Sequence, residues 1–189
     1  MKRTVFIDRD GVICEEINHL HKLEQIKLLD GAVKGIKLLN EKEYLTVVIS
    51  NQAVVARELC TEEEVRKMND YMNSLLEQWG ARIDVFYFCP HHPTVGNNPN
   101  YTRICDCRKP KPGMIFLAAK ELEIGDLGGT FYIGDKTSDI AAGKSAGCKT
   151  ILVRTGYGGN AAEKEIDFAE PDFIADNLEC AVKDIILKH

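Results

Sequence analysis

The sequence predicts an α/β fold: a Rossmann-like parallel sheet with helices on both faces. Short apolar runs rich in β-branched residues alternate with segments whose apolar residues recur at helical spacing. Continuous apolar runs are typical of strands buried on both faces, and strand–helix alternation is typical of a parallel sheet. Polar residues directly follow several runs, so we expect the chemistry at the carboxyl ends of the strands.

Composition narrows the possible classes of function. With 189 residues, of which 44% are hydrophobic and 28% charged, the chain is expected to form one domain spanning residues 1–189. No apolar run approaches the roughly 20 residues of a membrane span. A net charge of -5 argues against nucleic acid as the main partner. Seven cysteines without a secretory signal favour a reducing cytoplasm.

Five apolar runs are the expected strands. The first, residues 5–7, ends in Asp8, Arg9 and Asp10. If its extended geometry continues, Asp8 and Asp10 point to the same side and Arg9 points away. The other expected strands are residues 44–49, 83–89, 130–133 and 150–153, with a short apolar piece at 171–174.

The helices are predicted from caps and apolar stripes. Asp30 is a plausible N-cap for the helix that follows it, Thr61 begins a capping box with Glu64, and Asn177 caps the last helix. We interpret the stripes as core, because their spacing is helical. They consist of Ala32, Ile36 and Leu39; Val65, Met68, Met72, Leu75, Leu76 and Trp79; and Ile115, Ala118, Ala119 and Leu122.

Two carboxylates, Asp8 and Asp10, follow the first strand. They would repel each other, and a hard cation such as Mg²⁺ relieves that repulsion by taking oxygen ligands. Asp135, which follows another strand, could complete the set of ligands. One carboxylate could then attack phosphorus to form an aspartyl phosphate, while the other moves the proton. The alternative is that this motif is an ordinary polar turn.

Groups that could hold a phosphate follow the other strands. The hydroxyl of Ser50 and the amide of Asn51 could donate to phosphate oxygens, and a lysine, Lys109 or Lys111, could neutralise them. Positioning, charge neutralisation and a proton donor are what phosphoryl transfer requires. Each motif alone could be a turn, but the full set predicts phosphoryl transfer.

Four motifs resemble, in order and over most of the chain, those of the haloacid-dehalogenase-like phosphatase superfamily: Asp8-x-Asp10-Gly11-Val12, Ser50-Asn51-Gln52, Lys109 and Gly134-Asp135-x-x-x-Asp139. The resemblance implies that Asp8 is the nucleophile and that Asp10 is the acid to the leaving oxygen and then the base to water. It also implies that Asp8, Asp10 and Asp135 bind Mg²⁺, with Asp10 using only its backbone. Asp139 is expected to anchor its loop.

A second cluster lies at the two ends of an irregular segment: Cys89-Pro90-His91 and Cys105-Asp106-Cys107. Three thiolates and an imidazole suit a closed, tetrahedral structural zinc site. Such a zinc would shape the loop and take no part in hydrolysis. The alternatives are His92 as the fourth ligand, or free thiols. The other cysteines, expected in the core, are Cys14, Cys60, Cys148 and Cys180.

The zinc residues, followed by Arg108-Lys109-Pro110, resemble those of the D-glycero-D-manno-heptose 1,7-bisphosphate 7-phosphatase family and of the related histidinol phosphatases. This resemblance implies that Lys109 stabilises the phosphate and that Arg108 helps to recognise the distal part of the substrate. Lys136 and the Ser50-Asn51-Gln52 segment would also contact substrate. The alternative for Arg108 and Lys109 is a solvated basic turn.

One segment departs from that family, which usually reads threonine-asparagine-glutamine-serine-glycine-isoleucine-alanine-arginine-glycine after the second strand. Here Ser50 keeps the hydroxyl, Ala53 loses a possible hydrogen bond, and Val54 and Glu58 replace glycines. We therefore expect the chemistry to be retained and the substrate preference to be open to change. No insertion is large enough for a separate cap domain, so residues 13–29 and the zinc loop should roof the site.

These inferences together predict a monomeric, Mg²⁺-dependent phosphomonoesterase with a structural zinc and a small-molecule sugar phosphate as substrate. The resemblance implies removal of the 7-phosphate of heptose 1,7-bisphosphate, in the route to nucleotide-activated heptose for surface polysaccharide. Histidinol phosphate or another small phosphomonoester is the alternative substrate. A phosphosugar-binding module without turnover is a further alternative, which the complete set of catalytic residues argues against.

Overall fold

The computed structural model describes residues 3–158 and 169–189. Within them, six parallel strands form one sheet in the order β3-β2-β1-β4-β5-β6. This confirms the predicted parallel sheet, and the short apolar piece at 171–174 belongs to its edge strand. The strands are β1 Thr4–Ile7, β2 Leu45–Asn51, β3 Val85–Cys89, β4 Phe131–Gly134, β5 Lys149–Val153 and β6 Phe173–Ala175.

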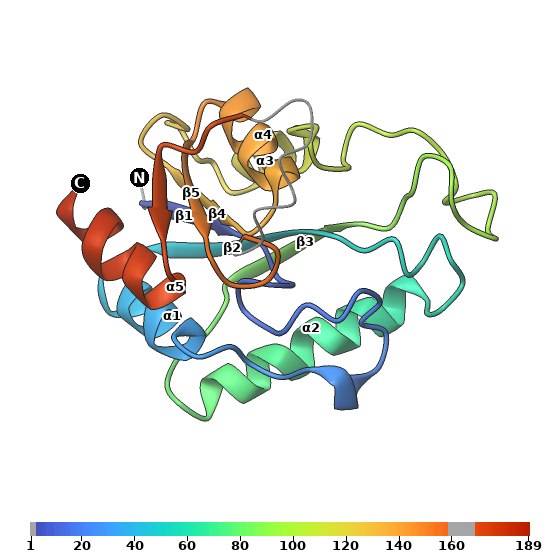
Figure 1. Cartoon of the computed structure of the whole chain (residues 1–189), viewed down its shortest axis with the longest axis horizontal. Helices are drawn as coiled ribbons and strands as arrows, with labels where there is room; N and C mark the ends of the chain where they lie inside the picture. The colour runs from blue at the N-terminus through green and yellow to red at the C-terminus, as the bar shows by residue number, and fades with distance from the viewer. Residues whose placement is uncertain (1–2, 159–168) are drawn as a thin grey trace.

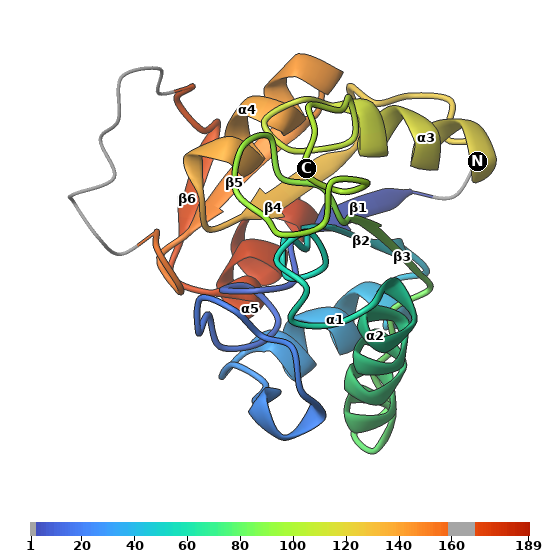
Figure 2. The ribbon, with the colours of Figure 1, turned by 90° about the vertical axis from the view of Figure 1, so that its right-hand side faces the viewer.

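Helices cover both faces of the sheet, as predicted. Helices α3 and α4 pack on one face, whereas α1, α2 and the C-terminal helical segment pack on the other (Figures 1 and 2). No helix among the described residues is long and apolar enough to cross a membrane. The helices are α1 Ala32–Glu41, α2 Glu62–Glu77, α3 Gly113–Glu121, α4 Thr137–Ala146 and α5 Leu178–Cys180, which continues as a π-helix, Ala181–Ile185, and a 3-10 turn, Ile186–Lys188.

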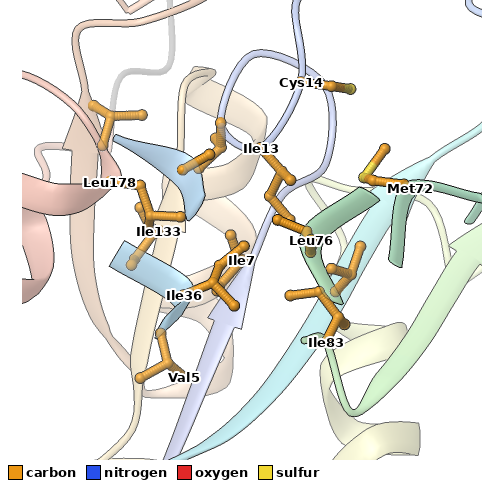
Figure 3. Packing of buried hydrophobic residues seen from close by; sticks show 14 of the residues in the cluster. Val5, Ile7, Ile13, Cys14, Ile36, Met72, Leu76, Ile83, Ile133 and Leu178 are labelled. Carbon is orange, nitrogen blue, oxygen red and sulfur yellow. The ribbon is translucent and has the colours of Figure 1, made fainter. Parts of the chain in front are cut away.

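The core has two halves because successive strand residues point to opposite faces. Val5, Ile7 and Ile133 pack toward α1, α2 and α5 (Figure 3). Phe6 and Tyr132 face α3 and α4 instead. The sheet is therefore buried on both sides. Its packing fixes the strands, and with them the position of the residue that follows each strand.

Two of the three predicted caps are confirmed. The Thr61 hydroxyl accepts from the amide of Glu64 at 3.2 Å, and the Asn177 side chain accepts from the amide of Cys180 at 3.0 Å. The prediction for Asp30 is wrong: the N-cap of α1 is Gly31, at φ 85°. A Cβ at Gly31 would lie 3.0 Å from the Asn177 side chain. The close approach of the C-terminal segment therefore favours glycine at this position.

One predicted core residue is exposed. Helix α2 ends at Glu77, and Trp79 lies beyond the helix with 66% of its surface exposed. Its sequence spacing is helical, but the chain leaves the helix before that spacing can place the side chain on the buried face.

The strand order places the site. The chain runs outward from β1 to β2 and β3, and then returns to place β4 on the opposite side of β1. Such a reversal leaves a crevice at the carboxyl ends of the two central strands. Asp8 follows β1 and Asp135 follows β4, and the Asp8 amide donates to the carbonyl of Ile133 at 2.9 Å. The two predicted metal-binding carboxylates therefore meet.

Candidate active site and metal centre

Three buried carboxylates converge at this crevice. One oxygen from each of Asp8, Asp135 and Asp139 lies within 4.8 Å of the others. Gly11 makes the approach possible, because it has φ 84° and a Cβ there would lie 2.1 Å from Asp135 Oδ2. A side chain at Gly11 would collide with a carboxylate of the site, which explains the glycine of the first motif.

The charges of this cluster favour a bound cation. Burial, together with the nearby Asp139, raises the pKa of Asp8 to about 6 and that of Asp135 to about 8. Asp135 Oδ2 accepts from the amide of Tyr157 at 2.9 Å, whereas Oδ1 is buried without a hydrogen bond or ion pair among the described residues. Carboxylates crowded in this way are suitable ligands for Mg²⁺, which prefers oxygen. Asp8 and Asp135 could hold it.

Lys109 is buried inside the cluster. Its Nζ lies 2.8 Å from Asp8 Oδ1 and 2.6 Å from Asp139 Oδ1, and it donates to the carbonyl of Ile49 at 2.9 Å. Burial alone would lower the pKa of Lys109, but Asp139 and Asp8 raise it well above its ordinary value. Lys111 instead pairs with exposed Asp106, so the position of Lys109 favours it as the phosphate-neutralising lysine.

Asp139 and Asn51 both support this lysine. Asp139 Oδ2 accepts from the amide of Lys136 at 3.0 Å, which agrees with an anchoring role, while Oδ1 faces Lys109. Asn51 Oδ1 accepts from the Lys109 amide, and its Nδ2 donates to the Lys109 carbonyl, both at 3.1 Å. In this structure the Asn51 side chain therefore positions Lys109, a contact that the sequence did not indicate.

Asp10 lies apart from the three clustered carboxylates. Regular strand geometry ends with β1 at Ile7, but Asp8 and Asp10 both line the cavity over the site, whereas Arg9 points away from it, toward Asn69 of α2, as predicted. Arg9 is buried, and its guanidinium holds both Asp10 oxygens, with Nε and Nη2 each at 3.0 Å. Burial alone would raise the pKa of Asp10, but Arg9 and the hydrogen bond from Gln52 hold it below its ordinary value.

A cavity of about 320 Å³ opens over these groups. Residues 13–29 and the segment after β3 contribute to its walls, as expected for a site roofed by loops. Ser50 lies in its lining, and its Oγ accepts from Gln52 Nε2 at 2.7 Å, so its hydroxyl hydrogen is available to a ligand. The lining comprises Asp8, Asp10, Glu16, Asn18, His19, Leu20, Ser50, Asn51, Gln52, Ala53, Val54, Arg57, His92, Arg108, Lys109, Lys136, Ser138 and Asp139.

Arg108 lines this cavity together with two residues that the sequence analysis did not assign to substrate, Arg57 and His92. Burial lowers the pKa of Arg108, and repulsion from Arg57 acts in the same direction. Burial also lowers the pKa of His92, with Arg108 and Arg57 contributing. The three groups are therefore near one another, and no described carboxylate forms an ion pair with either arginine. The lowered pKa leaves His92 neutral, so the positive charge comes from Arg108 and Arg57, and such a pair of cations is suited to an anion.

Lys136 also lines the cavity and bridges to its roof. Its Nζ lies 2.6 Å from Glu16 Oε2 and 4.6 Å from the centre of the Tyr157 ring. Tyr157 in turn donates to the Asn18 side chain at 3.3 Å. The lysine next to Asp135 therefore holds the loop of residues 13–29 against the site.

The predicted zinc residues come together. The sulfur atoms of Cys89, Cys105 and Cys107 lie 3.1–3.6 Å apart, and His91 Nδ1 lies 3.4 Å from Cys107 Sγ and 3.6 Å from Cys89 Sγ. Sulfur ligands of a tetrahedral zinc lie about 3.8 Å apart, so a zinc ion would fit with small shifts. The hydrogen bond between Cys107 and Cys89 lowers the pKa of Cys107 to about 5, which favours a thiolate there as a zinc ligand. His92 is not in this cluster and faces the cavity.

The altered segment after β2 keeps an unusual backbone. Glu58 adopts φ 58°, a left-handed conformation that costs a residue with a side chain about 1–2 kcal/mol. The Ala56 carbonyl accepts from the amides of Asn97 and Asn98 at 2.9 and 3.2 Å, so this segment and the zinc loop lie side by side (Figures 1 and 2). Val54 lines the cavity. Ala53 and Val54 therefore change the cavity wall, whereas Glu58 lies outside the lining and adopts a left-handed backbone conformation.

Comparison with known proteins is consistent with this geometry. A family model described as HAD-hydrolase-like matches residues 106–181. A D-glycero-beta-D-manno-heptose-1,7-bisphosphate 7-phosphatase of Pasteurella multocida is 40% identical over 82% of this chain and 84% of the relative. A D-glycero-D-manno-heptose-1,7-bisphosphate 7-phosphatase of Chlorobaculum tepidum is 39% identical over 98% of this chain and 94% of the relative. A D,D-heptose 1,7-bisphosphate phosphatase from B. bronchiseptica, crystallised with magnesium and phosphate, superposes with a TM-score of 0.87, 28% identity and 99% coverage of both chains.

A parallel sheet with this strand order, and with carboxylates following β1 and β4, defines a hydrolase of the haloacid-dehalogenase-like class. More closely, the chain belongs to the D-glycero-D-manno-heptose-1,7-bisphosphate 7-phosphatase family. It is therefore a phosphomonoesterase whose chemistry depends on Mg²⁺. The predictions of superfamily, fold class and enzyme class are confirmed.

Proposed function

We propose that this protein removes the 7-phosphate of D-glycero-D-manno-heptose 1,7-bisphosphate. The observation that carries the proposal is the composition of one cavity. Asp8 and Lys109 line it where the carboxylates converge, and Arg108 and Arg57 line it as a separate group of cations. A substrate with two phosphates can contact both groups, whereas a monophosphate can contact only one of them.

In the first step, an oxygen of Asp8 attacks phosphorus and forms an acyl-phosphate bond. The bond from phosphorus to the sugar oxygen breaks, its electron pair stays on that oxygen, and the oxygen takes a proton from Asp10. Arg9 and Gln52 favour the ionised form of Asp10 in the free protein, so Asp10 takes up this proton when the negative charge of the bound phosphates raises its pKa. Lys109, 2.8 Å from Asp8 Oδ1, and the hydroxyl of Ser50 would face the phosphate oxygens. Magnesium, held by Asp8, Asp135 and the backbone oxygen of Asp10, would supply positive charge that neutralises these oxygens.

In the second step, water attacks the phosphorus of the aspartyl phosphate. Asp10 takes a proton from the water, the bond to the Asp8 oxygen breaks, and its electron pair returns to the carboxylate. Inorganic phosphate leaves and both aspartates regain their starting states. The same carboxyl group thus serves as general acid in the first step and as general base in the second.

The distal phosphate should be bound by Arg108. The Arg108→Ala variant is expected to raise KM for the bisphosphate about 10- to 100-fold, because a hydrogen bond to a charged group contributes about 1.5–3 kcal/mol. The kcat/KM for 4-nitrophenyl phosphate should change by less than about threefold. This substrate has no second phosphate, so Arg108 would act on it only as a distant charge, and such charges contribute little. Steady-state kinetics with both substrates measure the difference.

Lys111→Ala provides the matched control for Arg108→Ala. Lys111 pairs with Asp106 outside the cavity, so its loss should leave both substrates unaffected. Arg57→Ala should act on the bisphosphate in the same direction as Arg108→Ala. Equal losses for both substrates in the Arg108 variant would show that this arginine supports the loop and not the distal phosphate.

The anomer of the substrate requires a direct test. A relative named for the alpha anomer, from Photorhabdus laumondii, is as similar to this chain as the beta-anomer relative above, at 40% identity. We expect kcat/KM values, measured with Mg²⁺, to differ several hundredfold between the two heptose anomers and to be lower still for histidinol phosphate. If every substrate is hydrolysed slowly and alike, the heptose assignment is wrong and Val54 and Glu58 become the place to look for another substrate.

We further infer that the whole chain, residues 1–189, forms one domain that acts as a monomer in the reducing cytoplasm. The site carries both the carboxylate cluster and the cations on one chain, so it needs no residue from a second copy, and the clustered thiols need a reducing compartment to remain available to zinc. Sedimentation of the purified protein should give the mass of one chain, and a stable dimer would contradict the inference.

A further inference from the structure

The carboxylate of Asp10 is surrounded by donors. Oδ1 accepts from Arg9 Nε at 3.0 Å and from the Cys14 thiol at 3.4 Å. Oδ2 accepts from Arg9 Nη2 at 3.0 Å and from Gln52 Nε2 at 2.8 Å. The side chain nevertheless lines the cavity and is 15% exposed. Its orientation toward the substrate is thus set by neighbours that do not themselves react.

Arg9 is the principal member of this set of neighbours, and it is held in turn. It is among the largest fully buried side chains, at 1% exposure. Its Nη2 donates to Gln52 Oε1 at 2.7 Å, and its Nη1 donates to the side chain of Asn69, in the middle of α2, at 3.1 Å. Gln52 also donates to Ser50 Oγ at 2.7 Å.

A purely stabilising role does not account for this arrangement. Burying a guanidinium costs desolvation free energy that its ion pair only partly returns, so apolar residues of similar volume are often at least as stable. A planar guanidinium that contacts both oxygens does, however, fix the plane of a carboxylate, which one cation or one amide cannot do. The geometry therefore has a directional consequence for Asp10.

We propose that Arg9, fixed by Asn69, is a positioning residue that orients the Asp10 carboxyl group toward the leaving oxygen of the substrate. This inference rests on the proposed function, in which Asp10 gives a proton to that oxygen and later takes one from water. Arg9 touches neither substrate nor metal ligand oxygens in this account. It acts through Asp10, and through Gln52 it joins Asp10 to the Ser50 hydroxyl that would face the phosphate.

Two substrates with different leaving groups separate positioning from general support. The sugar alkoxide released from heptose 1,7-bisphosphate needs a proton, whereas the nitrophenolate released from 4-nitrophenyl phosphate leaves without one. In the Arg9→Met variant, kcat/KM for the bisphosphate should fall about 100-fold or more, the range of general acid catalysis. The kcat/KM for 4-nitrophenyl phosphate should fall by less than about fivefold, since its first step needs no acid.

The second step gives an independent readout. Because Asp10 also takes the proton from water, hydrolysis of the aspartyl phosphate should slow in the variant. Rapid mixing of Arg9→Met with 4-nitrophenyl phosphate should then show a burst of one nitrophenolate per enzyme, followed by slow turnover. A residue that only supports the fold would lower the rates with both substrates together and give no burst.

Three further variants make the result decisive. Asp10→Asn sets the pattern expected for loss of the proton carrier, and if it shows no difference between the leaving groups, the proposed function itself is wrong. Met72→Ala is the matched control, because Met72 is buried one turn from Asn69 in α2 and does not line the cavity; both substrates should respond alike. Asn69→Ala should reproduce the Arg9 pattern more weakly, and it decides the question if Arg9→Met does not fold. The proposal is overturned if Asp10→Asn separates the substrates and the folded Arg9 and Asn69 variants do not.

Discussion

Asp8→Asn is expected to reduce kcat at least about 10⁴-fold, the scale on which loss of a catalytic nucleophile acts. The amide has nearly the shape of the carboxylate but does not form an acyl phosphate. The change also removes one of three carboxylates that crowd each other, whereas it weakens the ion pair with Lys109. These two effects oppose each other, so the melting temperature should stay within a few degrees of the wild-type value. Phosphate release and thermal unfolding measure the two expectations.

Asp70→Asn is the matched control for this variant. Asp70 lies on the exposed side of α2, so the same chemical change there should leave kcat and stability unaltered. Residual activity of Asp8→Asn within tenfold of the wild-type value would show that Asp8 is not the nucleophile. Direct attack of water on the substrate, with Asp8 only a metal ligand, would then be the better mechanism.

The part of the site that the sequence predicted is the part that topology determines. Asp8 and Asp135 are 127 positions apart, yet each directly follows a buried strand. Parallel strands end at a common edge, and the reversal of strand order brings these two ends together. The zinc residues were predictable for a related reason: the spacing of Cys89 with His91 and of Cys105 with Cys107 leaves few other chemical uses.

The remaining features depend on contacts that leave no periodic signal. Asn69, the partner of Arg9 on α2, is 60 positions away from Arg9 in the sequence. Asn51, whose side chain is hydrogen-bonded to the backbone of Lys109, is 58 positions away from that lysine. Arg57 joins the cavity because its segment packs beside the zinc loop. Alternation predicted that Arg9 points away from the cavity, but not that its guanidinium holds both oxygens of Asp10. Sequence patterns describe regular elements, whereas Arg9, Asn51 and Arg57 lie at or beyond the ends of such elements and Asn69 is a polar residue on the buried side of α2.

Loss of the zinc site should disable the enzyme by moving residues that never touch zinc. Cys107 directly precedes Arg108 and Lys109, and Arg108 Nη1 donates to the His91 carbonyl at 2.9 Å. Cys107→Ser replaces a strong zinc ligand with a weak one. We expect the variant to contain little zinc, to lose about 5–10 °C of melting temperature, which corresponds to a few kcal/mol for a chain of this length, and to show kcat/KM for the bisphosphate about 100-fold lower.

Cys148→Ser separates this effect from the cost of placing a hydroxyl in the core. Cys148 is buried, at 5% exposure, and lies outside the zinc cluster, so its variant should keep one zinc per chain and its activity. Elemental analysis, thermal unfolding and kinetics in saturating Mg²⁺ compare the two. Because most of the core on both faces of the sheet comes from the strands and helices, although Cys89, Cys105 and Cys107 border one half of it, Cys107→Ser should remain folded and lose its catalytic geometry locally. An active wild-type protein without zinc, or a Cys107→Ser variant with full activity, would show that the loop is held by its protein contacts alone.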